Sequence, residues 1–199
     1  NIKYFLLVQL YDIMEVTSSK ERFVSLLQKG DILLSKNEKN PIESVICKAV
    51  PDARWPHCRL YIGFGKSVES TVGGVKVKDI NEYLDTDNLM IIRPPEYIDK
   101  DKLVKDCMMY LGLNYSYLQF IRTGSLFLLK RLIKKDLRKY FRIDFDKNVV
   151  CCELIAYGLL KQGFEYEITP NFCFPDQFED DKRMEIIIKY VPPIYINTK

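Results

Sequence analysis

Residues 57–70 read HCRLYIGFGKSVES, and this stretch decides the fold. Residues 58–64 alternate loosely between apolar and polar, which predicts a strand. A tight turn at Gly65-Lys66 then predicts a second strand over 67–70, paired with the first as a hairpin. His57 stands at the start of the first strand, and Glu69 lies a cross-strand distance away on the second. This pairing predicts an imidazole and a carboxylate at one end of a sheet.

Further elements follow on both sides of the hairpin. Apolar runs predict strands at 32–34, 75–77, 89–93 and 184–190. Helical spacing and capping residues predict helices at 2–14, 20–29, 42–46, 79–84, 99–111, 117–141, 151–162 and 176–179. No repeat, low-complexity tract or long linker divides the 199 residues, so we expect a single domain over 1–199 that begins with a helical segment, about 1–29.

The composition is that of a globular protein without a strong charge. Hydrophobic residues make up 47% of the chain, and 30 basic against 27 acidic residues leave a net charge of +3. Nucleic-acid-binding domains usually carry a strongly basic face, so no nucleic-acid partner is expected.

The cysteines predict free thiols, and no metal site or other cofactor is expected. Six cysteines are present without a CxxC pair, and the chain has one histidine. The adjacent Cys151 and Cys152 would make a strained disulfide, so the cysteines favour a reducing, cytoplasmic compartment. An exported protein whose signal has been removed is the alternative. The apolar stretch 2–10 is too short to span a bilayer, which takes about 20 residues.

Cys151 is the strongest candidate nucleophile. It follows the apolar pair Val149-Val150 and begins a predicted helix, where the helix dipole and free N–H groups favour a thiolate. Its own N–H would also be a natural donor to an oxyanion. Taken singly, the residues have simpler interpretations: a core cysteine, a structural histidine such as His57 and a solvent-facing glutamate such as Glu69 are all common.

The order of these residues resembles the circularly permuted branch of the NlpC-type papain-like superfamily, the YiiX-like cysteine hydrolases. The resemblance spans most of residues 30–180. It rests on Gly30-Asp31-Ile32-Leu33-Leu34, Ser44-Val45-Ile46, Pro56 to Gly63, Val68-Glu69-Ser70, Gly74-Val75, Gly112 to Ser116, Val150 to Ile155 and Pro175-Asp176-Gln177-Phe178. The chain departs from the family pattern at Pro56, Ser116 and Val150, which stand where the family has a small polar residue, an Asp and an aromatic residue.

The resemblance implies an α+β fold in which a papain-like antiparallel sheet or small barrel packs against helices, with the nucleophile at a helix N-terminus. It assigns the nucleophile to Cys151, the base to His57 and the orienting carboxylate to Glu69, and it places Cys152 where the family has Ser. It also implies that a basic helical region, about 117–142, is an insertion.

The function expected is that of a cysteine amidase or peptidase, which cleaves a peptide-like amide or isopeptide through an acyl-enzyme. One alternative is a thiol-dependent lipid acyltransferase or acyl hydrolase at a membrane surface. That related group has an Asn and a His where this chain has Val150 and Leu154, which disfavours it. A non-catalytic binding module on the same fold is the second alternative.

Two further features concern the substrate and the surface. Trp55, Tyr115, Cys152 and Phe174 are candidates for contacts with a peptide-like or acyl-bearing substrate. Residues 130–142 hold seven basic residues and one acid around an apolar face. We favour a core-packed helix with solvated basic side chains for this stretch. The alternative is weak contact with an anionic membrane or polymer.

Overall fold

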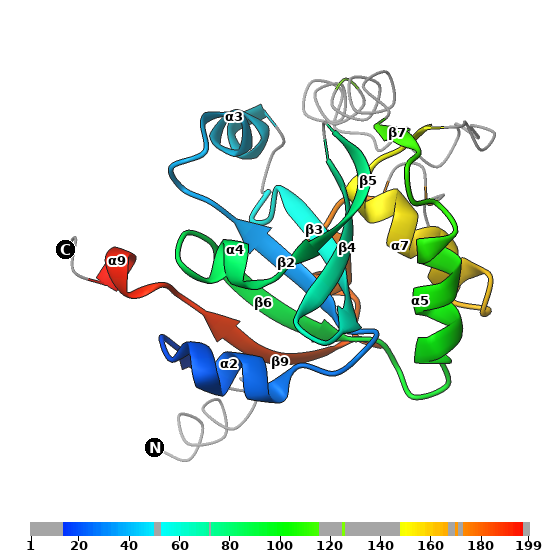
Figure 1. The fold of residues 1–199 in the computed structure, drawn as a ribbon, viewed down its shortest axis with the longest axis horizontal. Helices are drawn as coiled ribbons and strands as arrows, with labels where there is room; N and C mark the ends of the chain where they lie inside the picture. The colour runs from blue at the N-terminus through cyan, green and yellow to red at the C-terminus, as the bar shows by residue number, and fades with distance from the viewer. Residues whose placement is uncertain are drawn as a thin grey trace, which may run out of the picture.

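A mixed, open β-sheet forms the centre of the fold (Figure 1). The computed structural model describes residues 14–49, 53–71, 73–115, 125, 148–166, 170 and 173–196. Within these ranges seven strands follow the order β1-β9-β6-β2-β3-β4-β5. They are β1 (Val16–Thr17), β2 (Ile32–Lys36), β3 (His57–Gly63), β4 (Lys66–Thr71), β5 (Gly74–Asp79), β6 (Asn88–Arg93) and β9 (Glu185–Tyr190). A separate parallel pair joins β7 (Asn114–Tyr115) to β8 (Asn148–Val149).

Short helices flank the sheet. They are α2 (Lys20–Leu26), α3 (Pro41–Ala49), α4 (Asn81–Leu84), α5 (Lys100–Met108), α7 (Cys151–Leu160), α8 (Asp176–Asp180) and α9 (Pro193–Ile196). Side chains cap two of these helices: the Ser19 hydroxyl accepts from the N–H of Arg22, and the Asp99 carboxylate accepts from the N–H of Lys102. The predicted α+β class is therefore correct.

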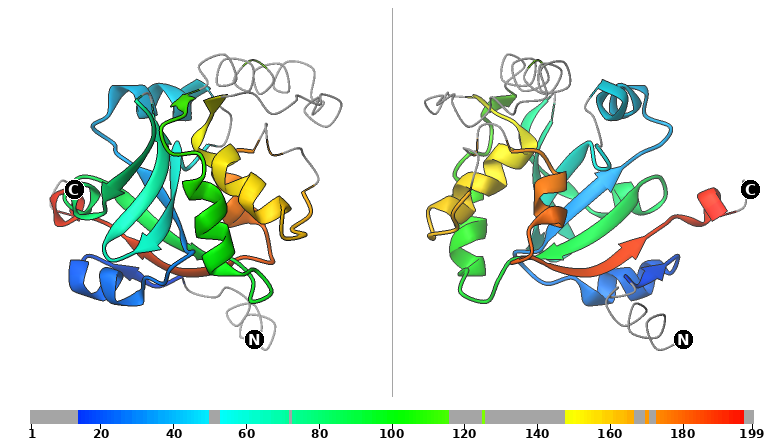
Figure 2. Two further views of the ribbon diagram at one scale, coloured as in Figure 1. Left: turned by 45° about the vertical axis from the view of Figure 1, so that its right-hand side comes forward. Right: turned by 180° about the vertical axis from the view of Figure 1, so that it is seen from behind.

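The two faces of the sheet bury two separate hydrophobic clusters. The helices α5 and α7 lie side by side on one face, as both views in Figure 2 show. Their apolar side chains pack there against Ile32, Cys58 and Leu60. On the opposite face Phe23 of α2 packs against Tyr190 of β9, with ring centroids 5.3 Å apart. Alternate residues of each strand thus point to different layers.

Several expectations need correction. The sheet is not entirely antiparallel, since β1 pairs with β9 in parallel, and it is open rather than closed into a small barrel. The helix predicted at 20–29 ends at Leu26, because the next residue already has an extended backbone. The short elements β1, β7 and α9 had no predicted counterpart. The helix predicted at 2–14 lies almost entirely outside the described residues, as does the region 117–142 apart from Ser125.

In the part of the chain that the structure describes, no helix is both long enough and apolar enough to cross a membrane.

Candidate active site

The β3–β4 hairpin brings His57 and Glu69 together. His57 Nε2 lies 2.8 Å from Glu69 Oε2. The Glu69 carboxylate is ionised and has no proton to donate, so the imidazole N–H is the donor of this hydrogen bond. The His57 side chain is 14% exposed and the Glu69 side chain 3%. The turn lies slightly earlier than predicted, and Phe64 at its tip has a positive φ of 53°. The predicted pairing of the two side chains is nevertheless present.

Cys151 is the first residue of α7, so its backbone N–H belongs to the end of the helix that has no intrahelical acceptors. Val150 precedes it and has no polar side chain with which to cap the helix. The Glu153 carboxylate instead accepts from the N–H of Val150 at 3.2 Å. Among the described residues no acceptor is recorded for the N–H groups of Cys151 and Cys152. In the described part of the chain, these two N–H groups at the start of α7 are therefore the candidate donors to an oxyanion.

His57 connects the hairpin to α7. Strand alternation points Cys58 toward α7, where it lies in the same buried cluster as Cys151 and Cys152. Alternation alone would turn His57 to the opposite face. Because His57 is the first residue of β3, its ring can reach around the end of the sheet toward Cys151, whose sulfur raises the pKa of His57.

The surroundings of His57 favour its protonated form. Burial opposes this charge, but the Cys151 sulfur and the Glu69 carboxylate more than offset burial and raise the pKa of His57 to about 9. Arg59, a third neighbour, acts in the opposite direction. At neutral pH the imidazole is therefore a cation between two groups that can carry negative charge.

Glu69 is held by more partners than His57 alone. Tyr83 of α4 donates its hydroxyl to Glu69 Oε1 at 2.7 Å, and Arg59 Nε lies 3.2 Å from Glu69 Oε2. Burial would raise the pKa of Glu69, but the hydrogen bond from His57 and the charge of Arg59 outweigh it and lower this pKa to about 2. The carboxylate thus stays ionised throughout the neutral range.

Sequence reasoning missed Arg59 and Tyr83. The recorded pairing of Leu60 with Val68 implies that Arg59 lies opposite Glu69, so the predicted hairpin already contained the signal for Arg59. Tyr83 comes from a helix that reaches Glu69 only through tertiary packing, and no local pattern indicates it.

The Cys152 thiol has a different hydrogen-bond partner from Cys151. Its thiol donates to the backbone carbonyl of Cys173 at 2.6 Å, and its side chain is buried. The neighbouring Cys151 favours ionisation of Cys152, but the hydrogen bond to Cys173 and burial prevail and raise the pKa of Cys152. Burial likewise raises the pKa of Cys58 well above its ordinary value. Both thiols are therefore kept in the neutral form.

Helix α8 anchors the segment that leads into β3. The Asp176 carboxylate accepts from the backbone N–H of Arg54 at 2.7 Å, and Glu179 accepts from the indole N–H of Trp55 at 2.7 Å. Arg54 also pairs with Asp180. These contacts fix the chain two residues before His57.

The four candidate substrate residues lie in different environments. Trp55 is 4% exposed and packs in the core, and Cys152 is buried, so neither presents an open surface. Phe174 is partly exposed in the loop before α8. The backbone of Tyr115 lies in β7, and its side chain is outside the described set. Of the three side chains that the structure describes, only that of Phe174 is partly exposed.

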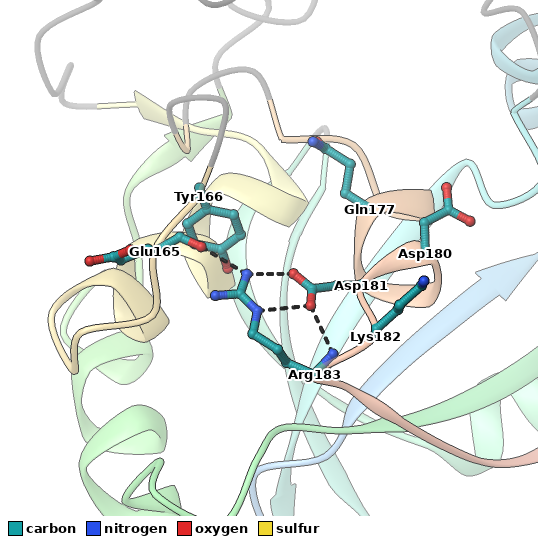
Figure 3. Close-up of a pocket in the computed structure, with 7 residues that line it drawn as sticks. All are labelled: Glu165, Tyr166, Gln177, Asp180, Asp181, Lys182 and Arg183. Atoms are coloured by element: carbon teal, nitrogen blue, oxygen red, sulfur yellow. Dashed lines mark hydrogen bonds and ion pairs between the residues drawn. The ribbon is translucent and has the colours of Figure 1, made fainter.

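A hollow of about 630 Å³ lies beside α8 (Figure 3). Its lining residues are Glu165, Tyr166, Gln177, Asp180, Asp181, Lys182 and Arg183. Arg183 crosses it to pair with Asp181 and to donate to the backbone carbonyl of Glu165. The lining includes none of the residues around Cys151.

Comparison with known proteins yields no family. No family model matches the chain, and no curated protein matches it. Within the described ranges, no group of three or more His, Cys, Asp or Glu side chains is arranged to hold a metal ion.

Proposed function

We propose that this chain is a cysteine hydrolase of the permuted NlpC-type papain-like class, which cleaves a peptide-like amide or isopeptide. One observation carries the proposal. A single imidazole, His57, hydrogen-bonds with the buried Glu69 carboxylate and interacts electrostatically with the Cys151 sulfur at the start of α7. Nucleophile, base and orienting group in this order are the components of thiol-based acyl transfer.

The arrangement supports a two-step reaction. The proton of Cys151 is carried by His57 as the imidazolium, and the thiolate attacks the substrate carbonyl to form a carbon–sulfur bond. The oxyanion that develops would be stabilised by the free N–H groups of Cys151 and Cys152. The imidazolium then gives its proton to the departing amine as the carbon–nitrogen bond breaks, leaving a thioester on Cys151.

Water completes the cycle. His57, now neutral, accepts a proton from a water molecule that attacks the thioester, and the carboxylic acid leaves as the Cys151 sulfur is released. Glu69 keeps the imidazole oriented in both steps, since its carboxylate remains bound to Nε2.

Selective alkylation tests the choice of nucleophile. The wild type and its Cys151→Ala and Cys152→Ala variants are treated briefly with a low concentration of iodoacetamide at pH 7, and the labelled peptides are mapped by mass spectrometry. We expect fast labelling of Cys151 that persists in Cys152→Ala and is lost in Cys151→Ala. Equal labelling of all exposed thiols, or label that follows Cys152, would contradict the proposal.

Activity-based probes test the substrate class. Thiol-reactive probes with a peptide recognition group are compared with probes that carry a fatty-acyl chain, on wild type and on Cys151→Ala. Preferential peptide-probe labelling at Cys151 supports the amidase assignment. Preferential acyl-probe labelling would reassign the protein as a lipid-directed acyl hydrolase or transferase, and no labelling by either class would favour a binding module.

A further inference from the structure

The Glu69 carboxylate is shared among two hydrogen-bond partners, His57 and Tyr83, and an ion-pair partner, Arg59. We propose that Arg59 and Tyr83 are positioning residues of the active site, which hold Glu69 and compete with His57 for its negative charge. The inference rests on the proposed function, because it assigns these residues a role in controlling the proton of His57.

The competition is visible in which oxygens are used. Arg59 Nε and His57 Nε2 approach the same atom, Glu69 Oε2, at 3.2 Å and 2.8 Å. Tyr83 donates to the other oxygen, Oε1, at 2.7 Å. Because the Glu69 carboxylate also pairs with a guanidinium and accepts from the Tyr83 hydroxyl, it stabilises the positive charge of the imidazolium less strongly. The effect is strong here because Arg59 and Glu69 are each only 3% exposed.

Arg59 cannot turn away from this position. One of its terminal nitrogens donates to the Ser35 hydroxyl at 2.9 Å, and its guanidinium carbon lies 3.4 Å from the centre of the Tyr83 ring. Asp87 lies 3.7 Å from the same terminal nitrogen. Tyr83 therefore both fixes Arg59 through its ring and fixes Glu69 through its hydroxyl.

The other charges near His57 determine the sign of the effect. The groups that interact electrostatically with His57 or Arg59 are Cys151 on α7, Glu69 on β4, Tyr83 on α4, Glu43 on α3 and Asp87 before β6. Glu69 and Cys151 favour the imidazolium, whereas the positive charge of Arg59 opposes it. Removal of Arg59 therefore makes His57 more basic.

This restraint matters for the chemistry. The imidazolium must release its proton to the leaving amine, and a proton donor becomes less effective as its basicity rises far above the working pH. Without competition for Glu69, the proton would be retained on His57 more firmly. Arg59 and Tyr83 thus keep the imidazolium acidic enough to act.

The lone histidine makes a direct test practical. Because His57 is the only histidine in the chain, its ring carbon proton can be followed by NMR through a pH titration without assignment of other residues. The wild type is compared with Arg59→Gln and Tyr83→Phe. Arg93→Lys is the matched control, since Arg93 forms a similar two-point pair with Asp31 at the far end of the sheet.

We expect the pH midpoint of the His57 titration to rise by roughly one pH unit in Arg59→Gln and by less in Tyr83→Phe. The midpoint should stay unchanged in Arg93→Lys. A midpoint that stays constant or falls in a folded Arg59→Gln protein overturns the inference, as does an equal rise in the Arg93→Lys control. Should Arg59→Gln fail to fold, the milder Tyr83→Phe decides: a rise supports the inference and a constant midpoint overturns it.

Cys151 alkylation of the same samples separates this inference from the proposed function. Wild-type Cys151 without selective reactivity refutes the hydrolase proposal even where the His57 midpoint moves as expected. A reactive Cys151 together with an unmoved His57 midpoint refutes only the roles of Arg59 and Tyr83.

Discussion

The Asp176 carboxylate accepts a 2.7 Å hydrogen bond from the backbone N–H of Arg54, although 122 positions separate them in the sequence. This bond ties α8 to the segment that carries His57 into β3. Asp176 itself is 8% exposed, so its loss would remove a largely buried acceptor from the N–H of Arg54.

Asp176→Ala should therefore destabilise the protein by about 1–3 kcal/mol, measured by urea denaturation. It should also slow alkylation of Cys151, because His57 loses its fixed approach. Asp101→Ala is the control: Asp101 pairs with Lys29 on the surface, with its side chain 81% exposed. Equal losses of stability in the two variants would show that the Asp176 contact has no special role.

The stability of the protein should depend on pH through His57 and Glu69. The pKa of His57 is raised from 6.5 to about 9, so its contribution is full below pH 6.5 and disappears as the pH rises through 9. The pKa of Glu69 is lowered from 4.5 to about 2, so its contribution is present above pH 4.5 and disappears as the pH falls toward 2. Glu69→Gln should weaken both dependences.

Thermal unfolding midpoints from pH 3 to pH 10 would measure this, with Glu82→Gln as the control. Glu82 forms an exposed pair with Lys78 and lies outside the site. Identical pH profiles for Glu69→Gln and wild type would refute the coupling of His57 to Glu69.

Two glycines provide a matched test of backbone strain. Gly74 and Gly163 both have a positive φ, 89° and 83°, which costs a side-chain-bearing residue about 1–2 kcal/mol. An added Cβ at Gly74 would also meet the carbonyl oxygen of Leu113 at 2.5 Å, whereas one at Gly163 would meet nothing within 4 Å. Gly74→Ala should therefore be clearly more destabilising than Gly163→Ala in chemical denaturation, and equal losses would contradict the close approach.

Phe64 offers a stabilising substitution. It is 100% exposed at the tip of the β3–β4 turn and has a φ of 53°, a conformation that asparagine adopts more readily than phenylalanine. Phe64→Asn should raise the free energy of unfolding by up to about 1 kcal/mol, measured by urea denaturation. A loss of stability would indicate that the aromatic ring makes a contact which the exposed fraction does not reveal.

Local patterns were sufficient for the hairpin and the start of α7. His57 and Glu69 could be paired because strand, turn and strand follow directly in the sequence, and Cys151 could be placed at a helix start because an apolar run precedes it. The proximity of Cys151 to His57 and Glu69, which precede it by 94 and 82 positions, is indicated only by the resemblance to a family.

What could not be predicted depends on distant contacts. The parallel pairing of Val16 with Lys189 joins the two ends of the described chain, and two-residue strands carry no periodic signal. Trp55 is a candidate substrate contact in the sequence, yet its indole N–H donates to Glu179 of α8 and its ring is buried. Neither partner is local in the sequence.

The position of β9 has a consequence for synthesis on the ribosome. β9 lies between β1 and β6, so the strand made first has no neighbour in the sheet until one of the last to be made has emerged. The strands β2 to β6 are mutually adjacent and can pair earlier. Cys151 is made after them and must wait for α7 to dock. The growing chain should therefore expose a Cys151 thiol of ordinary reactivity. The Cys151–His57 pair should form only late, after most of the chain has been synthesised.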